Sequence, residues 1–235
     1  MSTLVSAANR IATLASLTTN TTYAPSVAIS WEQTSQTSRK QLLREFIEYG
    51  DAIAYVKPDT GVLWIIDILT GIIPAININN FEVKSVSGEN QGKIIGKIVA
   101  DLMIKEFNDG GINGRPSLND IPVRLSLDTN KPSREEYPIK VKSLPTTLSG
   151  GQVVYSYTGI NSVLTRKKNI YESRIITIEY NNIIDLQIGQ RVNFDNTFED
   201  DNKMKGSGAM TVVSRVFNTK DTKMTITGIG TFTEA

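Results

Sequence analysis

An acidic cluster near the end of the chain contains the residues best suited to hold a cation. Asp195, Glu199, Asp200 and Asp201 precede Asn202, and such oxygen donors are the ligands of hard cations such as Ca²⁺ or Mg²⁺. The spacing differs from that of an EF-hand loop, which places Gly at its sixth position and Glu at its twelfth. A solvated loop at a strand end is the favoured interpretation, and we predict no metal site.

Two of these carboxylates also raise the question of glycoside hydrolysis. Asp195 and Glu199 would have to flank a scissile bond as an acid and a base or nucleophile. The chain contains no His and no Cys, and therefore lacks the commonest general base and any thiolate. We expect no catalytic residue and no cofactor, and predict that the protein is not an enzyme; a carboxylate-based hydrolase is the least favoured alternative.

A second cluster is basic and lies among aromatic residues. A site for single-stranded nucleic acid uses cations for phosphates and aromatic rings for base stacking. Three consecutive charges are more often a solvated turn between strands, and the formal net charge is only +1, so nucleic-acid binding is disfavoured. The cluster comprises Arg166, Lys167 and Lys168, with Tyr155, Tyr157 and Tyr171 nearby.

A short glycine motif, Gly206-Ser207-Gly208, follows Lys203 and Lys205. A phosphate-binding P-loop requires a longer glycine spacing, a final Lys-Ser or Lys-Thr, and a helix. A β-like run follows here instead, so the motif indicates a hairpin loop.

Two tryptophans, Trp31 and Trp64, could serve as carbohydrate-stacking platforms. Both lie within alternating apolar residues, which favours core packing.

Three segments have helical spacing. Ser38 and Gln41 have the spacing of a capping box before an apolar face, and Gly50 is placed to end that helix in the left-handed conformation. Residues 93–107 are predicted to be a second helix, because Ile94, Ile98 and Leu102 recur every four residues. In residues 1–17 one helical face predicts a short helix or an assembly arm; it carries Leu4, Ala8, Ile11 and Ala15.

Strand patterns dominate the rest of the chain. Residues 52–56 and 62–69 flank a turn rich in Pro, Asp and Gly, and predict a β-hairpin. After residue 121, short alternating segments are separated by turn residues, which is typical of a small antiparallel barrel or sandwich. We therefore predict a β-rich α+β protein with an arm or linker over residues 1–35, an α+β domain over 36–128, and an antiparallel β-barrel or β-sandwich over 129–235.

The most apolar stretch covers residues 61–78. It is interrupted by Asp67, Pro74 and Asn77 and is rich in β-branched residues. Strands therefore fit better than a membrane-crossing helix, and we predict no membrane span.

Two segments resemble tail hub and baseplate proteins of long-tailed bacteriophages and related contractile injection systems. The first has the order helix, strand, turn and strand, and the second has a leucine–glycine–valine step before a strand pair. The chain is short for a complete hub, and Gln190 stands where an acidic residue is common in that family. The segments are Leu42-Leu43-Arg44-Glu45-Phe46-Ile47-Glu48-Tyr49-Gly50 continuing to Ile65, and residues 174–192 with Thr211-Val212-Val213-Ser214-Arg215-Val216.

The resemblance implies a non-enzymatic structural subunit of a phage tail or baseplate, located in the virion and assembled in the host cytoplasm. It further implies a homo-oligomeric ring that contacts neighbouring tail or baseplate proteins. The alternative is a β-barrel module that binds carbohydrate or single-stranded nucleic acid.

Overall fold

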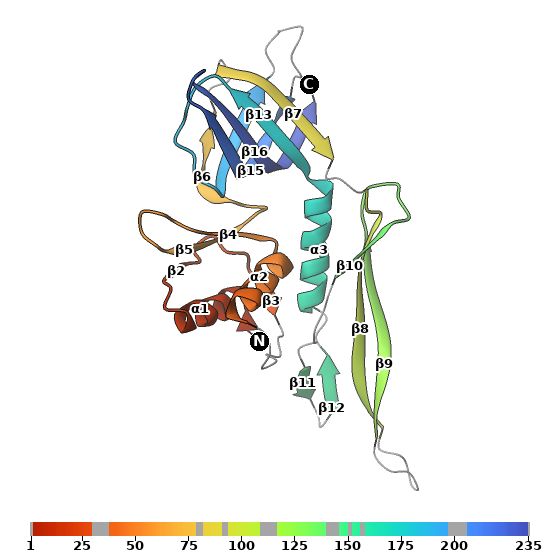
Figure 1. Ribbon diagram of the computed structural model, residues 1–235. Helices are drawn as coiled ribbons and strands as arrows, with labels where there is room; N and C mark the ends of the chain where they lie inside the picture. The colour runs from red at the N-terminus through yellow and green to blue at the C-terminus, as the bar shows by residue number, and fades with distance from the viewer. Residues whose placement is uncertain are drawn as a thin grey trace.

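The computed structural model describes residues 2–29, 38–78, 82–90, 94–108, 117–139, 146–149, 152–155, 158–196 and 206–234. Figure 1 shows an elongated molecule with a curved sheet at one end, helix α3 at the centre and a long two-stranded ribbon along one side. A smaller unit built around the other two helices lies on the opposite side of α3. The helices are α1 (Leu4–Leu14), α2 (Arg39–Gly50) and α3 (Thr158–Glu172).

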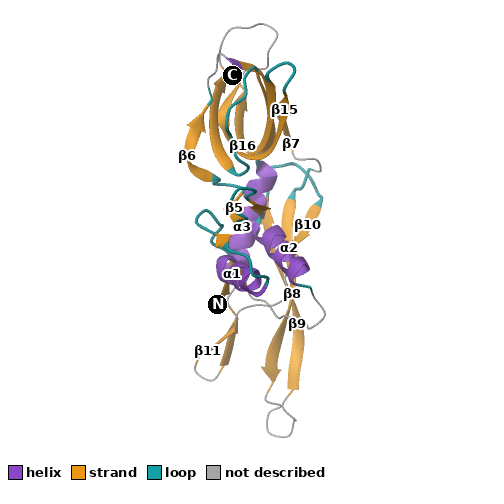
Figure 2. Ribbon diagram, turned by 60° about the vertical axis from the view of Figure 1, so that its left-hand side comes forward, coloured by secondary structure: helices purple, strands orange, loops and turns teal. Residues whose placement is uncertain are grey.

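The largest sheet has six strands in the order β6-β14-β15-β16-β13-β7. All neighbours are antiparallel except β6 and β14. Figure 2 shows the strong curvature of the sheet, but its two end strands, β6 and β7, are not paired with each other in the described chain, so the sheet is not a closed barrel. The strands are β6 (Ile72–Asn77), β7 (Val83–Asn90), β13 (Arg174–Tyr180), β14 (Gln190–Asn196), β15 (Gly206–Asn218) and β16 (Lys223–Glu234).

Alternation explains how this sheet forms its core. In β13, Ile176, Ile178 and Tyr180 are buried while their neighbours are more exposed, as expected for a strand with one face on a core. They pack with buried residues of β14, β15 and β16, including Phe194 and Met210. The predicted antiparallel strands are therefore present, but the sheet also takes β6 and β7 from before residue 129. The domain bounds given above stay a prediction.

The N-terminal unit packs α1 and α2 against a small sheet in the order β2-β5-β4. The predicted hairpin is confirmed, because β4 (Ala52–Val56) and β5 (Leu63–Asp67) are antiparallel. On α1, Leu4, Ala8 and Ile11 are buried as the helical face predicts, whereas Ala15 is the exposed C-cap. The remaining short strands of this part are β1 (Ser2–Thr3), β2 (Thr19–Asn20) and β3 (Ala28–Ile29).

Helix α2 begins where predicted, with the Ser38 side chain accepting a hydrogen bond from the amide of Gln41. Only this half of the predicted capping box is formed, because the Gln41 side chain donates to Glu45. The end of α2 differs from the prediction, because Asp51, with φ 49° and ψ 53°, is the left-handed residue, and Gly50 is still helical. Glycine at position 50 has another cause. A Cβ there would lie 2.0 Å from Leu4 Cδ1, so the Leu4 side chain or α1 itself would have to shift.

The helix predicted over residues 93–107 is wrong, since β8 (Lys97–Asn108) occupies most of this segment. A spacing of four residues fits both a helical face and a strand face, because four is close to one helical turn and is also an even number. Ala100 distinguishes the two, as it is buried together with Ile98 and Leu102 while Asp101 is exposed. Ile98, Ala100 and Leu102 therefore share one buried face of the strand, and Val99 on the other face is buried as well.

Strand β8 belongs to a three-stranded sheet in the order β10-β8-β9. With β9 it forms the long ribbon beside α3 in Figure 1. A shorter hairpin, β11-β12, lies near the N-terminal end of α3. The strands are β9 (Ser117–Asp128), β10 (Glu136–Ile139), β11 (Thr146–Ser149) and β12 (Gln152–Tyr155).

Candidate functional site

The predicted basic run is not a turn but part of α3. Ile160, Val163, Leu164 and Ile170 are buried along one side of this helix, which gives the i, i+3, i+4 spacing of an amphipathic helix. Lys167 occupies the position in that stripe where an apolar residue would complete the pattern, and it is only 8% exposed. The spacing of the four apolar residues was the available signal for α3, and the charges at 166–168 concealed it.

Arg166 forms a two-pronged ion pair with Asp67 at the end of β5. Its Nη1 donates to Asp67 Oδ2 at 3.0 Å and its Nη2 donates to Oδ1 at 2.8 Å. Nη2 also donates to the carbonyl oxygen of Gly50 at 2.9 Å. The two charged side chains are 14% and 10% exposed. A planar guanidinium fork matches a carboxylate in this way and fixes its orientation.

Lys167 makes the adjacent contact with the end of α2. Its Nζ donates to the carbonyl oxygen of Glu48 at 2.8 Å and to the carboxylate of Asp51. The last carbonyls of a helix have no partner inside the helix and carry partial negative charge. Lys167 and Arg166 therefore both interact with the C-terminal end of α2, and join α3 to the N-terminal unit.

Burial opposes the charges in this cluster, which we call the α3 ion-pair cluster (Asp51, Asp67, Arg166 and Lys167). Burial raises the pKa of the Asp51 carboxyl, an effect that the nearby Lys167 partly offsets. Asp51 Oδ2 and Arg166 Nε are buried without a hydrogen-bond partner. A buried ion pair that is incompletely hydrogen-bonded contributes little net stability, but losing one partner is costly. The arrangement therefore fixes how α3 and the N-terminal unit meet.

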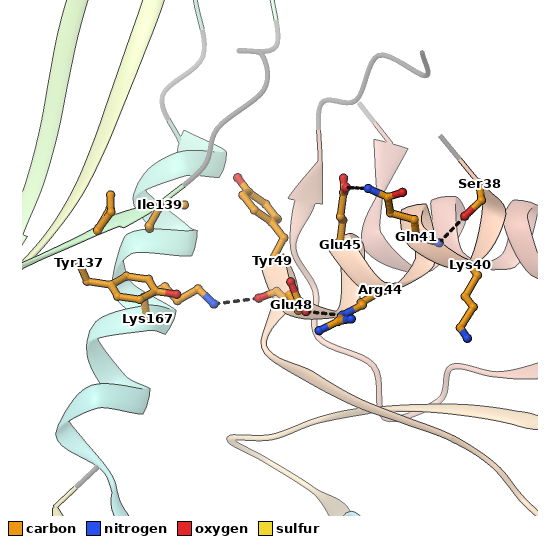
Figure 3. Close-up of a pocket in the computed structure, with 11 residues that line it drawn as sticks. Ser38, Lys40, Gln41, Arg44, Glu45, Glu48, Tyr49, Tyr137, Ile139 and Lys167 are labelled. Carbon is orange, nitrogen blue, oxygen red and sulfur yellow. Dashed lines mark hydrogen bonds and ion pairs between the residues drawn. The ribbon is translucent and has the colours of Figure 1, made fainter. Parts of the chain in front are cut away.

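A groove of about 860 Å³ lies beside this cluster. Figure 3 shows Gln41, Arg44 and Tyr49 of α2 on one side and Tyr137 of β10 on the other, with Lys167 reaching Glu48 between them. Arg44 and Glu48 form an exposed ion pair at 2.8 Å. Burial raises the pKa of Tyr49 to about 12. The groove is mixed in charge and shows no preference for an anion or a cation.

Lys168, the third residue of the basic run, is 31% exposed and pairs with Glu172 at 3.8 Å. Because Arg166 and Lys167 are committed to buried carboxylates, at most Lys168 is available to a phosphate. Tyr171 is half-buried and packs against Tyr137, with ring centroids 4.9 Å apart. The geometry does not favour single-stranded nucleic acid at this run.

The structure separates the remaining predicted site residues. Gly206-Ser207-Gly208 forms the start of β15 and pairs with β14 and β16, so it is strand and not a loop. Trp64 lies on β5, half-buried, with Lys57 Nζ 5.7 Å from its ring centroid. Asp195 is at an exposed position of β14. Outside the described residues lie Trp31, Tyr157, Glu199, Asp200, Asp201, Asn202, Lys203 and Lys205.

Within the described parts of the chain, no three His, Cys, Asp or Glu side chains are grouped so that they could hold a metal ion. None of the helices described has the length and apolar character needed to cross a membrane.

Comparison with known proteins identifies one similar fold and one weaker structural match. No protein-family model matches the chain, and no curated protein matches its sequence. The tail protein from Neisseria meningitidis MC58 superposes with a TM-score of 0.55 at 9% identity, covering 98% of this chain and 67% of that one. The 43 kDa tail protein of prophage MuSo2 from Shewanella oneidensis gives a TM-score of 0.48 at 13% identity, covering 97% of this chain and 65% of that one.

At 9% identity, the first match shows that the chain shares a fold with the Neisseria tail protein. The chain spans about two thirds of the length of each matched protein.

Proposed function

We propose that the chain is a non-enzymatic structural subunit of a phage tail or baseplate. The observation that carries this proposal is the shared fold with the Neisseria tail protein, which extends over 98% of the chain. The agreement is independent of the sequence resemblance noted above, because it arises from the arrangement of the whole chain and not from two short motifs. The protein then belongs to the virion and is assembled in the host cytoplasm.

The arrangement of the elements supports such a role. The six-stranded sheet and the N-terminal unit each have a buried apolar core. The β8-β9 ribbon and the β11-β12 hairpin extend away from the six-stranded sheet (Figure 2). A two-stranded hairpin such as β11-β12 has only marginal stability in isolation, and the backbone edges of extended strands can pair with other chains. These hairpins are thus suited to contact neighbouring subunits of a homo-oligomeric ring and adjacent tail or baseplate proteins.

The ion-pair cluster fits the same function. A ring subunit must present its contact surfaces in a fixed relative orientation, because small angular errors accumulate around a closed ring. Arg166 and Lys167 fix α3 against the N-terminal unit through side chains and backbone carbonyls. We assign this cluster a structural role in orienting the two parts of the subunit.

The test is the mass of the purified protein in solution. Light scattering over a range of concentrations should reveal a discrete oligomer, and negative-stain images should show rings or tubes. A protein that stays monomeric at every concentration, also when mixed with its tail neighbours, would contradict the proposal.

A further inference from the structure

A second, smaller pocket of about 430 Å³ lies where the C-terminal end of α3 meets the six-stranded sheet. Its volume is within the usual range for ligand sites. Leu69, Ile229 and Phe232 supply apolar walls, and the charged side chains that line it are Glu172, Arg174 and Arg191. The pocket is separate from the α3 ion-pair cluster.

Two of the three charges already have partners of opposite sign. Glu172 pairs with Lys168 and accepts a hydrogen bond from the amide of Asn130. Arg174 pairs with Glu234 at 3.3 Å and lies over the Phe232 ring. Arg191 is therefore the one charged side chain of this lining whose partners remain to be described.

Arg191 is a half-buried guanidinium whose hydrogen-bond partners are neutral groups. Its Nη1 donates to the carbonyl oxygen of Leu69 at 3.2 Å and to Thr211 Oγ1 at 3.3 Å. In the described chain no carboxylate lies within ion-pair distance of it, and Nε and Nη2 have no protein acceptor. Burial lowers the pKa of Arg191, with no opposing effect from an acidic neighbour. The contrast with Arg166, which binds both oxygens of Asp67, is clear.

The end of α3 cannot neutralise this charge. The carbonyls at a helix C-terminus together carry about half an elementary charge, and part of that effect is screened by solvent. A full positive charge at Arg191 therefore leaves the pocket with an excess of positive charge. Because Nε and Nη2 still have free N–H groups, a ligand at this position should accept two parallel N–H bonds, as carboxylates do.

We propose that this pocket binds a carboxylate group through Arg191, and that a neighbouring chain in the assembled tail supplies it. The apolar walls would contact the carbon atoms that carry the carboxylate, so an Asp, Glu or C-terminal group fits. The choice of a neighbouring chain rests on the proposed function, whereas the choice of a carboxylate rests on the pocket alone.

The first experiment tests the pocket without any assembly. Sodium acetate is titrated into the ¹⁵N-labelled protein while the Nε–H signal of Arg191 is followed by NMR, with sodium chloride at equal ionic strength as the control salt. We expect a saturable shift with acetate only, about tenfold weaker binding in Arg191→Lys because a point charge lacks the fork, and no binding in Arg191→Gln. Equal, non-saturating shifts in the two salts would overturn the site.

The second experiment tests the source of the carboxylate. Arg191→Gln is compared by light scattering with wild type and with Arg134→Gln, which removes the same charge from an exposed position outside the pocket. If a neighbour supplies the group, only Arg191→Gln reduces the assembled fraction, and acetate reduces it in wild type. Circular dichroism confirms that each variant is folded.

The outcomes separate the two proposals. Acetate binding with unchanged assembly in Arg191→Gln would overturn the neighbouring chain as source and indicate a free carboxylate ligand. A wild-type protein that never assembles would overturn both the proposed function and the neighbouring source, while the acetate titration would still decide the pocket.

Discussion

Arg166 on α3 donates to both carboxylate oxygens of Asp67 on β5, at 3.0 and 2.8 Å, across 99 positions of sequence. The pair is almost completely removed from solvent. It lies at the junction of the central helix and the N-terminal unit, so the relative orientation of these two parts depends on a contact between elements far apart in the chain.

Replacing Arg166 by Ala should be strongly destabilising. Asp67 would remain as a buried carboxylate without a counterion, which costs about 3–5 kcal/mol of unfolding free energy. Denaturant unfolding followed by circular dichroism measures the change. The matched control is Arg44→Ala, which breaks the exposed Arg44–Glu48 pair and should cost no more than about 0.5 kcal/mol. Similar losses for the two variants would contradict the role given to burial.

Replacing Lys167 by Met should give a defect that acid reduces. Met fits the apolar stripe of α3, but Asp51 loses the cation that offsets the effect of burial on its pKa, so that pKa rises further. The unfolded pKa of this carboxyl is about 3.8, and its folded pKa is higher. Such a group stabilises the folded protein fully at pH values below the unfolded pKa. This stabilisation is lost as the pH rises through the folded pKa.

The free-energy difference between Lys167→Met and wild type should therefore shrink as pH falls from neutral toward the unfolded pKa of about 3.8. Unfolding curves across this range measure it. The control is Asp51→Asn/Lys167→Met, in which position 51 does not titrate; Asn also tolerates the left-handed backbone found there. A deficit of constant size in the single variant would show that Asp51 is not the titrating group.

The sequence predicts local structure well where the turn chemistry and the spacing agree. The start of α2 follows from Ser38 and Gln41, and the β4-β5 hairpin from its turn residues. In contrast, α3 was not predicted, since Lys167 occupies its apolar stripe and becomes compatible with burial only through Asp51 and the carbonyl of Glu48. These partners are more than a hundred residues away, and local patterns carry no information on them.

The same limit applies to the candidate sites. Sequence reasoning found Arg166 and Lys167 as a basic run but assigned them to solvent, because the positions of Asp51 and Asp67 relative to α3 are set by tertiary packing. Arg191 gave no signal at all. A single arginine within a strand pattern is unremarkable until its lack of an acidic neighbour is known.

Gly50→Ala should destabilise the N-terminal unit, although Ala is the better helix former. The added Cβ would lie 2.0 Å from Leu4 Cδ1, so α1 or its side chain must move, which typically costs about 1–3 kcal/mol. Thermal unfolding measures the loss. In a Leu4→Ala background the clash is absent, and Gly50→Ala should there be neutral or stabilising; a loss of equal size in both backgrounds would argue against the close approach.

Ala100 on strand β8 offers a test of the strand against the helix predicted from the sequence. Ala100 is fully buried in the core that also contains residues of α3. The next residue, Asp101, is exposed, and its Oδ1 lies 3.6 Å from Arg124 Nε. Ala100→Asp would place an unpaired charge in the core and should prevent stable folding or cost several kcal/mol. Asp101→Ala removes only a contact in solvent and should cost less than about 1 kcal/mol.

Comparable effects at the two positions would contradict the assignment of Ala100 to the buried face of β8 and of Asp101 to the exposed face. A helix over this segment would place Ala100 about 160° away from the Ile98 and Leu102 side, so a tolerated Ala100→Asp would favour it. Unfolding free energies of the two variants, with far-ultraviolet circular dichroism to exclude a change of secondary structure, decide between a period of two residues and a period of 3.6.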